Sequence, residues 1–187
     1  MPDFDIGTVA TPVSDTGLIS IGGFAPVSFA DWPGEIAAVI FCQGCPWDCG
    51  YCHNPDLQAR PAGNASRWHR VLDTLVQRVG LLDGVVFSGG EPTLDAALPD
   101  AIRQVRDLGF EVGLHTAGLY PERLARCLPS VDWVALDVKT AFDSADELVL
   151  EVIEPSDPTV VQGIITTMAT NPEGTTLRSL LSAPTLA

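Results

Sequence analysis

Four short runs with the character of buried strands divide the middle of the 187-residue chain, and the first of them is rich in β-branched residues. The first run is continuous instead of alternating, which indicates a strand that is covered on both faces. The predicted strands are EIAAVIF (35–41), GVVFS (84–88), EVGLHT (111–116) and WVALDV (133–138). Amphipathic segments lie between them. Strands that alternate with helices predict right-handed βαβ units around a parallel sheet, so the expected fold class is α/β.

The segments between the predicted strands have the spacing of helices that pack on a sheet by one face. They are RWHRVLDTLVQRV (67–79), AALPDAIRQVRDL (96–108) and PERLARCL (121–128). In the second segment, Pro99 is expected to shorten or kink the helix. Cys127 lies on the apolar face of the third, and we expect it in the core. The predicted buried face of the first consists of Val71, Leu72, Leu75, Val76 and Val79.

One compact domain with distinct ends is expected. Residues 1–34, with GG at 22–23 and DWPG at 31–34, have the composition of an N-terminal β/turn segment. Residues 35–142 carry the strand and helix pattern. The pattern weakens in residues 143–187, which are expected to form either strand and helix or a disordered tail. There, ADELVLEVIE (145–154) is compatible with a helix and TVVQGIITTMA (159–169) with a fifth strand.

Composition limits the classes of protein to which the chain can belong. With 46% hydrophobic residues, the chain can bury a core without a metal or a disulfide to support folding. Its formal net charge of -14 repels phosphate backbones, so no nucleic acid is expected as a partner. The sequence shows neither a signal-peptide pattern nor an apolar run near the roughly 20 residues that span a bilayer. We therefore expect a cytoplasmic protein with no membrane partner.

Polar and reactive residues follow each predicted strand at its C-terminal end. In chain order these groups are the cysteines of 42–52, SGGEP (88–92), HTAG (115–118) and DVK (137–139). Parallel α/β folds bind ligands where loops leave the C-terminal ends of the strands. The four groups therefore predict one shared site.

The cysteine loop places Cys42, Cys45, Cys49 and Cys52 within eleven positions. In a reducing compartment such a cluster is more typical of a metal or redox site than of disulfides. A closed zinc site usually separates its two cysteine pairs by a dozen or more residues, and here only three residues separate them. The spacing also differs from that of a bacterial ferredoxin. The last three thiolates can instead hold three corners of an iron-sulfur cubane and leave one iron open.

The loop resembles the signature of the radical S-adenosylmethionine (SAM) enzymes, CxxxCxxC with an aromatic residue, here Tyr51, before the last cysteine. Over residues 17–142 the chain resembles the activating proteins of anaerobic ribonucleoside-triphosphate reductase, which are glycyl-radical-enzyme activases. The three-cysteine loop and GGEP are specific as a pair. The stretches that carry the resemblance are IGGFAPVSFADWPGEIAAVIFCQGCPWDCGYCHNPDL (21–57), FSGGEPTL (87–94) and VDWVALDVK (131–139).

This resemblance implies a partial (β/α) barrel of the radical SAM type, and the weak pattern after residue 142 is compatible with truncation of that barrel at its C-terminal end. It also implies a [4Fe-4S] cluster on Cys45, Cys49 and Cys52, with SAM bound to the open iron. One electron, from a donor such as flavodoxin or ferredoxin, would cleave SAM into methionine and a 5′-deoxyadenosyl radical. That radical would take a hydrogen atom from a glycine Cα of the partner, which is expected to be anaerobic ribonucleotide reductase.

The same resemblance implies roles in SAM binding for the polar residues at the strand ends. Gly89 and Gly90 would offer backbone carbonyls to the methionine ammonium group, and Glu91 would supply its countercharge. No residue is assigned a catalytic role by the sequence.

The remaining SAM contacts are assigned to residues of the cysteine loop and of the third and fourth predicted strand ends. Tyr51 would pack near the adenine. Lys139 is the only lysine of the chain, and it would pair with the methionine carboxylate. Asp137 and Thr116 would hold the ribose, the rest of SAM or a small cation.

Several alternatives stay open on the sequence alone. Cys42 is expected to be a buried cysteine beside the cluster, or else the fourth thiol of a zinc site. His53 is expected to pack within its loop, and His69 to lie on the surface. Within enzymes, the alternative partner is formate acetyltransferase or another glycyl radical enzyme. Outside enzymes, the alternative is a non-catalytic iron-sulfur or zinc-binding module.

Overall fold

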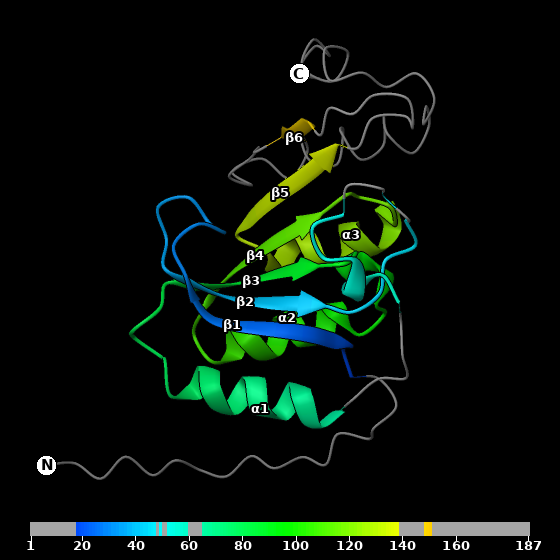
Figure 1. Ribbon diagram of the computed structural model, residues 1–187. Helices are drawn as coiled ribbons and strands as arrows, with labels where there is room; N and C mark the ends of the chain where they lie inside the picture. Colours follow the sequence, from blue (N-terminus) through cyan, green and yellow to red (C-terminus); the bar gives the residue numbers. More distant parts are fainter. Residues whose placement is uncertain (1–17, 48, 50–51, 60–64, 139–147, 151–187) are drawn as a thin grey trace, which may run out of the picture.

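A six-stranded sheet forms the centre of the protein. The computed structural model describes residues 18–47, 49, 52–59, 65–138 and 148–150. The strands follow their order in the sequence across the sheet, as Figure 1 shows. Their bounds are β1 Ile21–Ser28, β2 Ala37–Cys42, β3 Gly84–Gly89, β4 Glu111–Thr116, β5 Trp133–Val138 and β6 Leu148–Leu150.

The four predicted strands are β2 to β5, and all of them pair in parallel. The predicted α/β fold class with a parallel sheet is therefore confirmed. The edge strands β1 and β6 are antiparallel to their neighbours. β1 lies within the predicted N-terminal β/turn segment and joins the same sheet, while the boundaries after residues 34 and 142 stay predictions.

The helix predicted over residues 145–154 is wrong where the structure describes it. Residues Leu148–Leu150 form β6 and pair with β5 from Leu136 to Val138. The open edge of β5 offers backbone hydrogen bonds to any apolar segment that reaches it, and this context outweighs the helical preference of the sequence. The fifth strand predicted over residues 159–169 lies outside the described residues.

Three α-helices connect the parallel strands: α1 Ala65–Val76, α2 Leu98–Asp107 and α3 Pro121–Cys127. Pro99 stands in the first turn of α2, so it shortens the predicted helix at its start. Helix α1 ends earlier than predicted, which leaves Val76 and Val79 more than half exposed. The predicted apolar face is thus wrong at these two positions. Trp68 completes the buried face instead.

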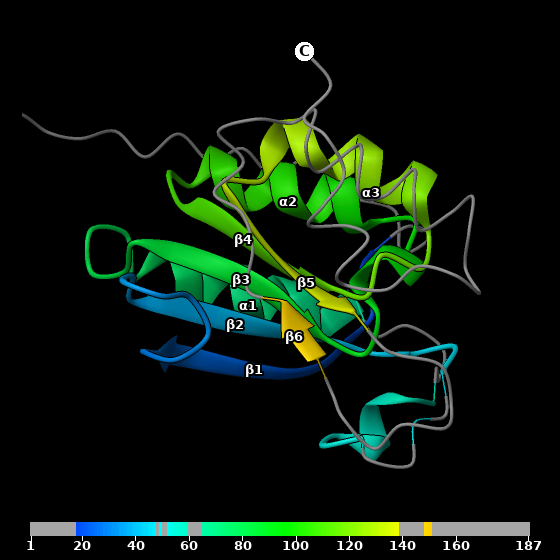
Figure 2. The ribbon, with the colours of Figure 1, turned by 90° about the horizontal axis from the view of Figure 1, so that it is seen from above.

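The helices cover one face of the sheet. Side chains of all three helices share one core with the strand residues that point toward the helices, including Phe87 and Leu114. Figure 2 shows α2 and α3 together on one side of the sheet. Cys127 belongs to this core as predicted, and burial raises the pKa of its thiol to about 11. Among the described residues, no helix combines the length and the apolar character needed to cross a membrane.

The opposite face of the sheet has a smaller core around Trp32, which belongs to the connection between β1 and β2. The Trp32 indole stacks on that of Trp133 with ring centroids 5.5 Å apart. Two glycines make room for it: a Cβ on Gly84 or Gly113 would lie 2.7 or 3.0 Å from Trp32. The connection therefore folds back over this face near the N-terminal ends of the parallel strands.

Candidate functional site

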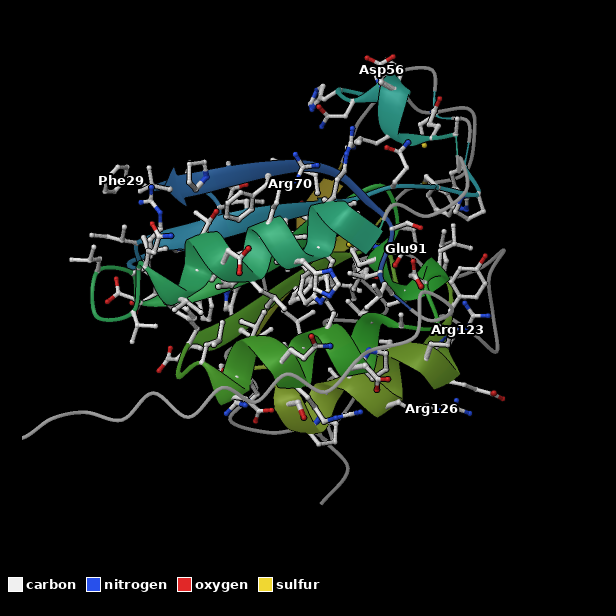
Figure 3. The ribbon with its side chains drawn as sticks, turned by 90° about the horizontal axis from the view of Figure 1, so that it is seen from below. Phe29, Asp56, Arg70, Glu91, Arg123 and Arg126 are labelled. Carbon is white, nitrogen blue, oxygen red and sulfur yellow. The ribbon has the colours of Figure 1, made fainter. Side chains whose placement is uncertain are left out.

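A pocket opens at the C-terminal ends of β2 to β5, where the sequence predicted a shared site. Figure 3 shows Glu91 and the loop that carries Asp56 at one end of the sheet, with Phe29 at the other. The pocket brings together every predicted site residue that the structure describes. They are Cys45, Cys49, Cys52, Gly89, Gly90, Glu91, Thr116 and Asp137.

Two predicted residues, Tyr51 and Lys139, lie outside the described part of the chain. Their proposed contacts with adenine and carboxylate therefore stay predictions. His53, expected to pack within its loop, is exposed and lines the pocket, and His69 is exposed as predicted.

The two glycines of SGGEP fix the start of the cysteine loop. Gly89 has φ of +104°, and a Cβ there would lie 2.6 Å from the backbone nitrogen of Cys42. At Gly90 a Cβ would lie 2.2 Å from the carbonyl oxygen of Gly44. Because no side chain intervenes, Gly90 N–H donates to Cys42 O at 3.0 Å and Glu91 N–H donates to Gly44 O at 2.9 Å. The glycines are thus required for close backbone contact; their proposed carbonyl contacts with SAM stay a prediction.

The cysteine loop leaves β2 and is closed at its neck by hydrogen bonds. Gly44 N–H donates to Leu57 O at 2.7 Å, and Cys45 N–H donates to Gln58 O at 3.0 Å. The side-chain amide of Gln43 donates to the carbonyl oxygens of Asp56 and Ala59. The bonds join residues 43–45 to residues 56–59, so the three pocket thiols lie on a loop whose two ends are tied together.

The three thiols at the pocket are partly exposed, and none of them forms a disulfide. Burial raises the pKa of Cys45 above its ordinary value. A backbone hydrogen bond with Trp47 opposes this rise, whereas Glu91 and the other two thiols add to it. A thiolate in this acidic surrounding needs a cationic partner, which iron supplies.

The three thiols can be compared with the ligand patterns of a zinc site and of an iron-sulfur cluster. Among the residues that the structure describes, no three Cys, His, Asp or Glu side chains converge on one position for a metal ion. In a cubane each thiolate binds a different iron, whereas the ligands of a zinc site share one ion. All three thiols line one pocket, and their assignment as ligands of a [4Fe-4S] cluster stays a prediction.

Cys42 is set apart from the other thiols of the loop. It is 1% exposed, belongs to the core on the helix face and is not among the residues that line the pocket. Burial, with a contribution from Asp95 and then from Glu91, raises the pKa of its thiol far above the ordinary value. The predicted burial of Cys42 is confirmed. Its position does not suit the zinc alternative, which required Cys42 as a fourth ligand.

Glu91 connects the ends of β3 and β4 beneath the pocket. Its side chain is 2% exposed, and its Oε1 accepts hydrogen bonds from the backbone and hydroxyl groups of Thr93 and from the Thr116 hydroxyl. Its Oε2 accepts from the Ala117 N–H at 2.9 Å. These donors stabilise a buried carboxylate. Glu91 and Thr116 thus bind each other, and their proposed direct contacts with SAM stay predictions.

Ser88 and His115, which belong to the predicted groups SGGEP and HTAG but were given no role in SAM binding, also line the pocket. Ser88 Oγ lies 3.2 Å from Nδ1 of His115, and Nε2 of His115 lies 2.8 Å from the carbonyl oxygen of Asp31. The imidazole also meets Trp133 edge-on, with centroids 5.3 Å apart. Strand periodicity could have assigned both side chains to the same face, because each precedes a strand end by one position and lies on the face opposite the helices.

Comparison with known proteins decides the family. The family model of the Radical SAM superfamily matches residues 39–165 of the chain. The chain belongs to the radical SAM superfamily. Its cofactors are therefore those of the superfamily, a [4Fe-4S] cluster and SAM.

Several curated proteins resemble this radical SAM chain. A protein of Methanocaldococcus jannaschii, provisionally named a glycyl-radical enzyme activating enzyme, is 34% identical over 69% of the chain and 54% of its own length. The pyruvate formate-lyase-activating enzyme of Clostridium pasteurianum is 34% identical over 63% of the chain and 51% of its own length. The chain thus spans about half the length of the curated relatives it matches. Among solved structures, QueE from Escherichia coli has a TM-score of 0.44 and 18% identity, covering 82% of this chain and 74% of that one.

Proposed function

We propose that this radical SAM protein is an activase that installs a glycyl radical in a partner enzyme. The observation that carries the proposal is the pocket, which is lined both by Cys45, Cys49 and Cys52 and by the GGEP turn at the end of β3. The names of the relatives support the same class of reaction. The reducing conditions that free thiols and such a cluster require favour the cytoplasm as its location.

The chain's own residues hold and shield the reacting groups. The three thiolates bind the cluster on a loop closed at its neck by Gln43 and by backbone bonds to residues 57 and 58. When bound, the cluster would supply the electron for reductive cleavage of SAM, and this chemistry would remove a hydrogen atom from a glycine Cα of the partner. We assign to Lys139 the methionine carboxylate and to Tyr51 the adenine. Gly89, Gly90, Glu91, Thr116 and Asp137 are assigned to the remaining contacts with SAM.

The proposed partner is anaerobic ribonucleotide reductase, because the motifs of residues 21–57, 87–94 and 131–139 resemble those of its activating proteins. A second candidate is pyruvate formate-lyase, after which the relative from Clostridium pasteurianum is named. The electron donor that we propose is a flavodoxin or a ferredoxin. No nucleic acid or membrane takes part in the proposed reaction.

The experiment uses the full chain, reconstituted with iron and sulfide without oxygen and reduced in the presence of SAM. We expect 5′-deoxyadenosine, measured by chromatography, and a glycyl radical, measured by EPR, on one of the two purified candidate partners. If only pyruvate formate-lyase acquires the radical, the lyase and not the reductase is the partner. An iron-loaded protein that forms neither product with either partner would overturn the activase proposal in favour of a non-catalytic iron-sulfur module.

A further inference from the structure

One wall of the pocket contains Ser88 and His115, which belong to one row of residues across the parallel strands. Phe41 of β2 pairs with Ser88 of β3, and His115 of β4 pairs with Ala135 of β5. Ser88 and His115 lie two positions beyond Val86 and Gly113, which contact the core around Trp32. Side chains two positions apart share a face of a sheet. The row therefore lies between the tryptophan layer and the strand ends.

The hydrogen bonds of His115 fix the polarity of this wall. The carbonyl oxygen of Asp31 can only accept, so the Nε2 of His115 that lies 2.8 Å from it must carry the proton. Both hydrogen-bond partners of the imidazole are neutral groups. In the neutral imidazole Nδ1 is then an acceptor, and the Ser88 hydroxyl must donate to it. The lone pairs of Ser88 Oγ are left for a ligand in the pocket.

This polarity selects a ligand with a hydrogen-bond donor. Both the peptide substrate of an activase and SAM carry such donors. SAM is a charged molecule, and the pocket offers it the carboxylates of Glu91 and Asp137, whereas Ser88 and His115 are uncharged when the imidazole is neutral. A target glycine has no side chain, so only its backbone N–H and C=O can be recognised. A neutral wall with one acceptor suits a peptide N–H.

We propose that Ser88, held by His115, accepts a hydrogen bond from a backbone N–H of the glycine-bearing segment of the partner. The inference rests on the proposed activase function and adds how the substrate is recognised. Ser88 is a binding residue in this scheme. His115 is a positioning residue, because it acts by holding the proton of the Ser88 hydroxyl toward itself.

A double-mutant cycle tests the proposed bond. The probe is a synthetic peptide with the glycine and its neighbours from whichever candidate partner acquires the radical. In matched peptides, each amide N–H next to the glycine is replaced in turn by an ester oxygen. One ester should weaken binding to the reconstituted full chain about three- to tenfold, the worth of one hydrogen bond. In the Ser88→Ala and Ser88→Cys variants the same ester should weaken peptide binding less than twofold, since neither variant retains the hydroxyl.

Other variants separate positioning from structure. His115→Phe keeps a ring against Trp133 but frees the Ser88 proton, so its ester penalty should fall between those of the wild type and Ser88→Ala. Thr74 serves as the control, because its hydroxyl donates to Arg70 O within α1, outside the pocket. Thr74→Ala should retain the full ester penalty. A purely structural role of His115 would lower peptide affinity without changing the ratio of ester to amide.

The outcomes distinguish this inference from the proposed function. If no partner acquires a radical and no 5′-deoxyadenosine forms, the activase proposal fails and this inference fails with it. If the radical forms but every ester lowers the peptide affinity of Ser88→Ala as much as that of the wild type, only the inference is overturned. A loss of SAM affinity in Ser88→Ala with unchanged peptide affinity would also overturn it, because the donor would then belong to SAM.

Discussion

The two ends of the parallel sheet both use glycine to let parts of the chain approach closely, but for different purposes. At the N-terminal ends, Gly84 and Gly113 make room for the Trp32 indole. At the C-terminal ends, Gly89 and Gly90 make room for the backbone of residues 41–44, which leads into the cysteine loop. The first contact buries apolar surface and contributes stability. The second orients hydrogen-bonding groups and positions the pocket, so the two ends should respond differently to substitution.

The largest expected effect concerns the thiols at the pocket end. Cys45→Ala, Cys49→Ala and Cys52→Ala should each abolish cluster binding, because three thiolates leave no spare ligand for the cubane. Cys42→Ala is the matched control, since this thiol lies in the core on the helix face. It should retain most of the iron. Iron content per chain after anaerobic reconstitution measures the difference, and equal losses in all four variants would make Cys42 a ligand.

Trp32→Ala should reveal the contribution of the opposite end. Removing this indole, which is 6% exposed and stacks on Trp133, should lower the free energy of unfolding by about 3–5 kcal/mol. Urea denaturation measures that loss. The variant should still bind iron at low temperature, because Trp32 is not among the residues that line the pocket. Loss of iron from a variant that remains folded would show that the two ends are not independent.

Gly90→Ala should affect both stability and the site. The added Cβ would meet the Gly44 carbonyl oxygen at 2.2 Å, so the backbone must shift, at an expected cost of about 1–3 kcal/mol. The hydrogen bonds from Gly90 and Glu91 to the start of the cysteine loop would lengthen, and SAM affinity should fall. In the control, Gly23→Ala, the nearest atom is a Phe41 side-chain carbon at 3.3 Å. Calorimetry with SAM on samples of matched iron content compares them, and equal affinities would contradict the role assigned to Gly90.

The smallest expected effect is a loss of one or two side-chain hydrogen bonds, compared at the neck of the cysteine loop and between two helices. Gln43→Leu removes the amide that donates to Asp56 O and Ala59 O, and Gln104→Leu removes the acceptor of Trp68 Nε1–H between two helices. Each should cost about 1–2 kcal/mol of stability. Only Gln43→Leu should speed the loss of iron to a chelator, because only it loosens the loop. Equal rates of iron loss in the two variants would remove Gln43 from the support of the cluster.

The sequence predicted features that depend on neighbours along the chain. β4 and β5 have the bounds expected from their apolar runs, because a buried strand imposes a local pattern on its own residues. The cysteine spacing and GGEP indicated the radical SAM superfamily, since the loop and the turn are each short segments. Parallel strands place their C-terminal ends at one edge, so the convergence of these segments at one pocket followed as well.

Tertiary structure alone decided the contacts between distant segments. Glu91 meets Thr116 and Ala117 across 25 and 26 positions, and His115 meets Asp31 across 84. The end of α1 before Val79 and the pairing of β6 with β5 also depend on what the rest of the chain offers in space. No local pattern encodes such partners, because hydrogen bonding and burial depend on distance in space and not on separation in sequence. The sequence thus determined which residues reach the pocket, and the fold determined which of them already bind one another.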